Sequence, residues 1–149
     1  MHFHGMEVMT VLMGKYNHAL DSKGRVIIPS KIKEQLGPVI TVLKGNDKCL
    51  RLYSAEEWAL YAEKISALPA TQSRAITRYL YSNAIEVTPD AQGRVTLPQE
   101  MLEFAGITKN LVTAGCGRYA EIWSAERWEA CALNDEPENF TEELEKLGL

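Results

Sequence analysis

An aspartate followed four residues later by an arginine occurs twice in the chain, as Asp21 with Arg25 and as Asp90 with Arg94. Two aspartates brought close together would shift each other's pKa, as in a carboxylate pair that transfers protons. Alternatively, each aspartate accepts backbone N–H groups in a turn and is neutralised by its own arginine. The second use is common for an aspartate in a turn, and the spacing alone leaves both open.

The residues inside the two motifs add a second kind of chemistry. Lys23 lies between Asp21 and Arg25, and Gln92 takes the same place in the other motif. Arginine binds guanine or phosphate through two hydrogen bonds, lysine contacts phosphate as a point charge, and glutamine pairs with adenine. This set suits the major groove of DNA, although such residues are often ordinary surface side chains. The predicted DNA-binding residues are Lys23, Arg25, Gln92 and Arg94.

The rest of the sequence gives no support for catalysis. It holds no Gly-rich phosphate loop, no G-x-S-x-G elbow and no H-E-x-x-H motif, and His18 has no obvious acid partner. The cysteines form no C-x-x-C pair and are expected to be small, partly buried thiols. They are Cys49, Cys116 and Cys131. We predict a protein that is not an enzyme and has no cofactor, no metal ion and no small-molecule substrate.

Composition and charge indicate a globular protein of 16.7 kDa with one basic end. The net charge is −4, yet residues 15–51 hold eight Lys or Arg against three Asp or Glu, and residues 121–149 hold nine acids against two bases. A basic end suits phosphate, although a run of charge is more often a solvated surface. No apolar run is long enough to span a membrane and the first 13 residues lack a signal-peptide pattern, so we expect a cytoplasmic protein without a membrane partner.

Most of the chain consists of two copies of one unit. Residues 21–37 align with residues 90–106 with seven identities in 17 positions, and the alignment resumes at Gly45 and Gly115. It ends with residues 54–58 against residues 124–128. Each copy spans only about 45 residues, near the size below which a domain buries too little surface to fold alone. We therefore expect the two copies to pack together as one body.

Each copy is predicted to fold as strand, turn, strand, helix, strand, turn and strand. The aspartate accepts backbone N–H groups in the first turn, the following glycine supplies a positive φ, and a proline and a glycine bracket the helix. In the first copy the expected strands are 16–20, 25–28, 39–43 and 50–53, with a helix at 30–36 and a loop at 45–47. The predicted turn-stabilising residues are Asp21, Gly24, Asp90 and Gly93.

Two helices are expected between the copies. Ser54 and Glu57 predict a capping box for the first, whereas Arg127 stands where the second copy would need the glutamate, so that its helix should begin less firmly. The other connecting helix is expected over 71–83. Arg74 and Arg78 share one side of it, where they would either contact DNA or, as we prefer, be solvated or bridge their own helix.

The two matched tryptophans and the C-terminus complete the predicted elements. Trp58 and Trp128 follow helix starts and are expected to anchor the core. The residues after Ala132 are too polar to pack, so we expect an acidic, mobile tail with a terminal helix from Thr141.

The duplicated motif and the helical insert resemble those of the MraZ family over about residues 13–128. The two copies read D-S-K-G-R-V-I-I-P at 21–29 and D-A-Q-G-R-V-T-L-P at 90–98. That family consists of bacterial transcriptional regulators built from two AbrB-like swapped-hairpin units in one chain. The resemblance implies an α+β fold of two such pseudo-symmetric units packed as one small body, with helices between and after them.

The same resemblance implies a function and partners. The protein would bind short direct repeats of double-stranded DNA in the promoter of the division and cell-wall gene cluster, its own gene included, and would therefore lie at the nucleoid. It would assemble into a ring-shaped homo-oligomer, in which several turns contact adjacent repeats and raise the avidity. The family's signature lies on its DNA-facing side, which transfers to Asp21, Lys23, Arg25, Asp90 and Arg94.

The repeat and the resemblance together set the expected domains. These are a flexible leader or mis-assigned start at 1–14, a first AbrB-like unit at 15–58, connecting helices at 59–84, a second AbrB-like unit at 85–128 and an acidic tail at 129–149. Family chains begin close to Met13, so Met1–Leu12 is either a mis-assigned start or an extension. Because Gln92 replaces lysine in the second motif, we expect the first copy to attract phosphate more strongly.

One alternative function stays open. An antitoxin-like or other protein-interaction module with an AbrB-like fold would use the acidic tail to bind a protein partner.

Overall fold

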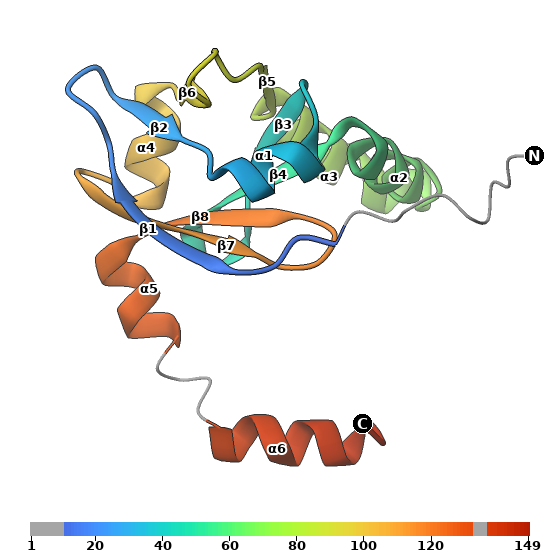
Figure 1. The fold of residues 1–149 in the computed structure, drawn as a ribbon. Coiled ribbons are helices and arrows are strands. Elements are labelled where there is room, and N and C mark those ends of the chain that lie inside the picture. The colour runs from blue at the N-terminus through green and yellow to red at the C-terminus, as the bar shows by residue number, and fades with distance from the viewer. Residues whose placement is uncertain (1–10, 133–136) are drawn as a thin grey trace, which may run out of the picture.

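The computed structural model describes residues 11–132 and 137–149, which form a mixed α and β body (Figure 1). The strands are β1 (Lys15–Ala19), β2 (Arg25–Ile27), β3 (Ile40–Lys44), β4 (Leu50–Ser54), β5 (Ile85–Val87), β6 (Arg94–Thr96), β7 (Asn110–Gly115) and β8 (Ala120–Ser124). The helices are α1 (Ser30–Leu36), α2 (Ala55–Ser66), α3 (Ala70–Ser82), α4 (Gln99–Ala105), α5 (Ala125–Ala132) and α6 (Pro137–Lys146), with a 3-10 turn, η2 (Asn46–Lys48). The predicted order of elements within a copy is confirmed, with ends that differ by about one residue.

The strands of the two copies are interleaved. The large sheet has the order β1-β7-β8-β4-β3-β5, and a separate ribbon consists of β2 and β6. The first strand of the first copy, β1, therefore pairs with β7 of the second copy, and β5 of the second copy pairs with β3 of the first. All these pairs are antiparallel. Neither copy forms a sheet of its own, which confirms that the two copies make one body.

The main core lies between the large sheet and a layer formed by the ribbon, α1 and α4. Successive side chains of a strand point to opposite faces, and the apolar residues of alternate positions face this layer. The buried residues at its centre are Val26, Ile32, Ile40, Val42, Leu50, Leu52, Val95, Leu102, Leu111 and Ile122. The ribbon thus rests on the core by one face and leaves the other face outside.

The helices α2 and α5 pack on the opposite face of the sheet. Trp58 of α2 lies 6.3 Å from Tyr53 between ring centroids, and Trp128 of α5 meets Trp123 edge-on at 5.6 Å. Both Trp58 and Trp128 remain partly exposed. The two tryptophans therefore hold the helices against the outer sheet face and lie outside the main core in which we expected them.

The two helix starts carry equal caps. The Ser54 hydroxyl accepts the Glu57 N–H at 3.1 Å, and the Ser124 hydroxyl accepts the Arg127 N–H at the same distance. The Glu57 carboxylate does not complete the predicted box, because it lies 3.4 Å from Nη1 of Arg118. The expectation of a weaker second start is therefore not supported by the cap geometry.

Two further expectations are corrected at the chain ends. The terminal helix begins at Pro137 instead of Thr141, because a proline fits the first turn of a helix. The described part of the tail that we expected to be mobile is therefore helical.

Leu12 lies within the expected leader 1–14 but is 2% exposed and exchanges backbone hydrogen bonds of 2.7 and 2.8 Å with Gly117. A Cβ at Gly115 would collide with the backbone beside Leu12, so glycine permits this close approach. Residues 1–10 of the expected leader lie outside the described residues.

Candidate nucleic-acid interface

The first aspartate–arginine motif forms a closed turn between β1 and β2. Asp21 Oδ1 accepts hydrogen bonds from the backbone N–H groups of Lys23 and Arg25, both at 2.9 Å, and Asp21 Oδ2 accepts one from Arg25 Nε at 2.6 Å. The backbone N–H of Gly24 donates to the Asp21 carbonyl at 3.0 Å, and the φ of Gly24 is 71°. One carboxylate thus holds both the turn and the arginine side chain.

The second motif repeats this geometry and adds one contact. Asp90 Oδ1 accepts the backbone N–H groups of Gln92 and Arg94 at 2.9 Å, and Asp90 Oδ2 accepts Arg94 Nε at 2.8 Å. In addition, Nη2 of Arg94 donates to the side-chain oxygen of Gln92 at 3.1 Å. The glutamine therefore holds the second arginine, whereas the lysine of the first turn has no such contact with Arg25.

The two aspartates do not form a carboxylate pair. The strands β2 and β6 are antiparallel, so the turns that precede them lie at opposite ends of the ribbon. The backbone N–H of Arg25 lowers the pKa of Asp21 most strongly, and that of Arg94 does the same for Asp90. Two carboxylates sharing a site would instead raise one of the two pKa values.

The ribbon brings the two arginines together on its outer face. The register of β2 against β6 makes Arg25 and Arg94 diagonal neighbours, with Cα atoms about 7–8 Å apart. Val26 and Val95 point inward and are buried, whereas the side chains of Arg25 and Arg94 are 25% and 29% exposed. Ile27, between them, is 49% exposed. The outer face therefore combines two cations with one apolar side chain.

The charged ends of the first turn are available to a ligand. Among the described residues, neither the Nη groups of Arg25 nor the ammonium of Lys23 makes a hydrogen bond to protein. Figure 1 shows the β1–β2 turn and the β5–β6 connection along one edge of the molecule, on the opposite side of the sheet from α5. The acidic C-terminal part thus leaves the body on the side away from the turns.

The arginines of α3 lie apart from this face. Arg74 and Arg78 are exposed, and within the described part of the chain they form no ion pair. They are solvated and do not bridge their own helix, while the alternative that they contact DNA stays a prediction.

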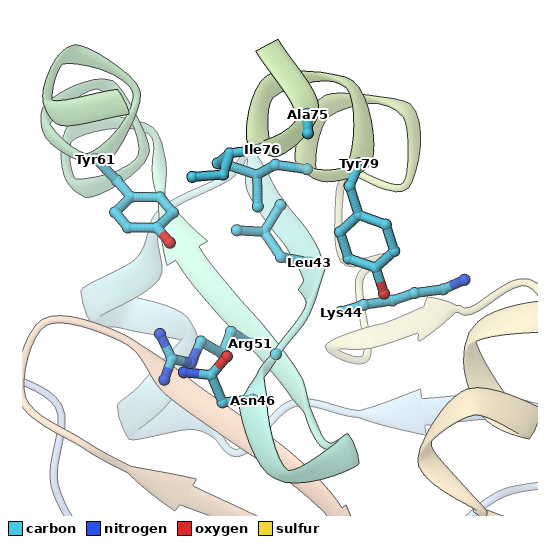
Figure 2. A pocket seen from close by; sticks show the side chains of 10 residues that line it. Leu43, Lys44, Asn46, Arg51, Tyr61, Ala75, Ile76 and Tyr79 are labelled. Atoms are coloured by element: carbon cyan, nitrogen blue, oxygen red, sulfur yellow. The ribbon is translucent and has the colours of Figure 1, made fainter. Parts of the chain in front are cut away.

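A hollow of about 320 Å³ lies between α2, α3 and the β3–β4 hairpin (Figure 2). Figure 2 shows Tyr61, Ile76 and Tyr79 along its helical walls, with Arg51 on the strand side. The Arg51 guanidinium stacks on Tyr119 at 4.3 Å and is therefore already engaged. Among the described residues that line the hollow there is no histidine, cysteine or carboxylate.

The histidine and the cysteines are explained by local packing. His18 Nε2 lies 3.0 Å from the Thr113 hydroxyl across β1 and β7, and burial lowers the pKa of this histidine. Cys49 is buried, and burial raises its thiol pKa. Cys116 and Cys131 are exposed, which corrects the expectation of partly buried thiols at those two positions.

Comparison with known proteins decides the family. A family model described as "MraZ protein, putative antitoxin-like" matches residues 11–78 and again residues 80–148. The chain belongs to the MraZ family. Each match contains one aspartate–arginine turn and therefore one copy of the repeat; the first match also extends over the connecting helices to residue 78, and the second extends over the C-terminal segment to residue 148.

Similar MraZ proteins are full-length matches. A protein of Clostridium tetani named "Transcriptional regulator MraZ" is 42% identical over 142 residues, which cover 93% of this chain and 100% of that protein. A protein of the same name from Limosilactobacillus reuteri is 43% identical over 141 residues, covering 93% and 99%. One from Caldanaerobacter subterraneus subsp. tengcongensis is 41% identical over 143 residues, covering 93% and 100%.

Membership of the MraZ family confirms the resemblance and the prediction that the chain is not an enzyme. In the described ranges, no helix is long and apolar enough to cross a bilayer. Sequence reasoning missed Ile27 and Thr96, which share the outer face of the ribbon with the arginines. The alternation of buried and exposed residues in β2 and β6 was the available signal, but three-residue strands are too short to show it clearly.

Proposed function

We propose that this MraZ-family protein is a DNA-binding transcriptional regulator that recognises short direct repeats through its two turns and the ribbon between them. The observation that carries the proposal is the pair of arginines on the outer ribbon face, each held through Nε by its own aspartate. An arginine fixed in this way loses less side-chain freedom when its Nη groups bind a base or a phosphate. The names of the relatives support regulation of transcription as the outcome.

The proposed mode of recognition follows from the shape of the ribbon. The major groove is about 12 Å wide and admits a two-stranded β-ribbon. Arg25 and Arg94 would read guanine, Gln92 would hold Arg94 or pair with adenine, and Lys23 would contact phosphate. Ile27 adds an apolar side chain suited to the methyl group of thymine.

The interleaved strands support an AbrB-like swapped-hairpin classification. In each copy the first hairpin reaches across, so that its strands pair with strands of the other copy. We keep the two units at 15–58 and 85–128, with connecting helices at 59–84 and an acidic tail at 129–149, as part of the proposal.

Oligomerisation is part of the proposed recognition. One ribbon offers few base contacts, and binding that rests on so few contacts is weak at cellular salt. A ring that presents several ribbons to adjacent repeats gains avidity without new contacts. The sheet ends at the edge strands β1 and β5, and Ile76 and Tyr79 of α3 are 42% and 56% exposed. These features support contact between molecules of this protein.

The promoter of the division and cell-wall genes, including the protein's own gene, is the proposed target, and the nucleoid is the proposed location.

The proposal is tested with DNA that carries one, two or four direct repeats from the protein's own promoter. We expect affinity to rise with repeat number and log affinity to fall linearly with log salt, because phosphate contacts release counterions. Light scattering on the same samples should give a mass several times 16.7 kDa. Scrambled DNA of equal length is the control. Binding that is absent or insensitive to salt would exclude recognition through the turns.

The second candidate is a protein-interaction function, which the antitoxin-like family description favours. Phe140 and Leu147 of the C-terminal segment are 59% and 70% exposed. Together with Leu144 they follow the i, i+4, i+7 spacing that places apolar side chains on one face of a helix. Such a face can bind in a hydrophobic groove of a partner protein.

A further inference from the structure

The interleaved strands carry a lysine of the first copy to the turn of the second copy. The backbone N–H of Ile28, at the end of β2, donates to the Gly93 carbonyl at 2.8 Å, which fixes the start of α1 beside the second turn. A Cβ placed on Gly93 would lie 3.7 Å from Lys33 Cδ and 3.9 Å from Lys33 Nζ. The ammonium of Lys33 therefore stands next to the turn that contains Gln92.

The first turn receives no lysine from α4. The residue of α4 that is equivalent to Lys33 in the repeat is Leu102, and it lines the hollow beside Asp21 and Gly24. A Cβ placed on Gly24 would meet nothing within 4 Å. The first turn contains its own lysine at position 23 and shares a hollow with Lys109, whereas the second turn, which has Gln92 in place of Lys23, receives Lys33 from α1.

We propose that Lys33 supplies the phosphate-binding cation of the second turn, the position that Gln92 leaves without charge. This inference rests on the proposed binding of DNA through the turns. Among the described residues, the Lys33 ammonium forms no hydrogen bond and no ion pair, so it is available to a phosphate. With Lys33 included, the second turn holds two cations, Lys33 and Arg94, against the carboxylate of Asp90.

A structural role for Lys33 is the alternative outcome. The residue lies in the last turn of α1, where a cation interacts favourably with the carbonyl end of the helix. That role would change the stability of the protein and would leave the salt dependence of DNA binding unaltered.

The experiment compares Lys33→Ala with Lys23→Ala and with the control Lys31→Ala in the full chain, using the repeat DNA described above. Lys31 lies on the same helix but lines a hollow with Tyr16 and Gln35, and no residue of either turn lines that hollow. We expect Lys33→Ala and Lys23→Ala each to reduce the slope of log affinity against log salt by about one per engaged turn. At about 0.1 M salt this corresponds to a loss of roughly five- to tenfold in affinity per engaged turn.

Two rescue variants separate charge from helix stability. Lys33→Arg should keep the wild-type slope, and adding Gln92→Lys to Lys33→Ala should restore it, because a lysine then stands on the second turn itself. Thermal melting of each variant checks that the fold is intact. The control Lys31→Ala should keep the wild-type slope. If Lys33→Ala also keeps it, while wild type and Lys23→Ala behave as expected, the assignment of Lys33 is wrong. If wild type itself fails to bind the repeats, the proposed function fails and takes this inference with it.

Discussion

At the scale of single residues, the aspartate–arginine motif is both a structural lock and a device that positions a binding group. The two carboxylate oxygens of Asp21 are used differently: one holds the backbone of the turn and the other holds Arg25 through Nε. The sequence suggested these as competing explanations, a hairpin lock or a DNA contact. The geometry allows one arginine to take part in both, because its Nη groups extend beyond the lock.

This double use predicts a pH-dependent effect of Asp21→Asn on stability. The pKa of Asp21 is lowered in the fold, chiefly by the backbone N–H of Arg25 and also by its side chain. The ionised carboxylate therefore stabilises the fold above its ordinary pKa of 3.8, and this contribution is lost as the pH falls through the lower folded value. We expect wild type to melt at a higher temperature than Asp21→Asn at pH 7, and the two melting temperatures to converge below pH 3.8.

The companion variant Arg25→Ala separates the lock from the DNA contact. It leaves the backbone hydrogen bonds to Asp21 in place, so we expect a modest change in melting temperature and a loss of about 1–3 kcal/mol in DNA binding per engaged turn. A variant that melts much earlier but, once folded, binds repeat DNA with full affinity would assign the arginine to the lock alone.

At the scale of elements, much of the fold was predictable because the local signals are strong. The turn glycine, the proline before each short helix and the alternation in β3 and β4 defined the order of elements within a copy. The pairing between copies could not be predicted from these local signals, and only the family resemblance implied an exchange of hairpins. The apolar pattern of a strand is the same whether the strand pairs within its own copy or with the other copy. Only the packing of the whole core decides that the strands pair between the copies. The position of Lys33 beside the second turn depends on that exchange, so no spacing in the sequence could reveal it.

The C-terminal helix gives the prediction that belongs to this scale. Figure 1 shows α6 clear of the sheet and on the far side from the turns, and its described residues carry Glu142, Glu143 and Glu145. Removing residues 137–149 should leave repeat binding intact or tighten it, because acidic residues repel phosphate. Fluorescence anisotropy against the full chain measures this.

A matched variant distinguishes charge from the apolar side chains of the same C-terminal segment, Phe140 in α6 and Leu147 just after it. Replacing Phe140 and Leu147 by serine keeps the acids, so it should not alter DNA affinity, but it would abolish docking of α6 on a protein partner. Loss of repeat binding after removal of α6, with assembly preserved, would instead place this helix in the DNA-binding unit.

At the scale of the whole molecule, the two copies are related by a pseudo-twofold axis that passes between β4 and β8. Arg51 and Glu121 face each other there in register, and they are equivalent positions of the repeat. Two identical copies paired in this way would oppose like charges at the axis, which destabilises a sheet. In this chain the two positions differ: Arg51 Nε lies 3.8 Å from Glu121 Oε2, and the two side chains are 19% and 13% exposed. This pair of opposite charges favours pairing of the two different copies within one chain.

Reversing the charge at the axis therefore tests how the molecule is held together. Glu121→Arg places two arginines opposite each other and should lower the free energy of unfolding by about 1–3 kcal/mol more than Glu121→Gln. The glutamine variant is the matched control, because it keeps an acceptor for the Trp123 Nε1–H that Glu121 Oε1 now binds at 2.9 Å. Adding Arg51→Glu to Glu121→Arg restores opposite charges and should recover part of the loss, although not the hydrogen bond to Trp123. Urea denaturation of these proteins and of Arg51→Glu alone gives the coupling energy of the pair, and equal losses for Glu121→Arg and Glu121→Gln would show that charge at the axis does not select the pairing.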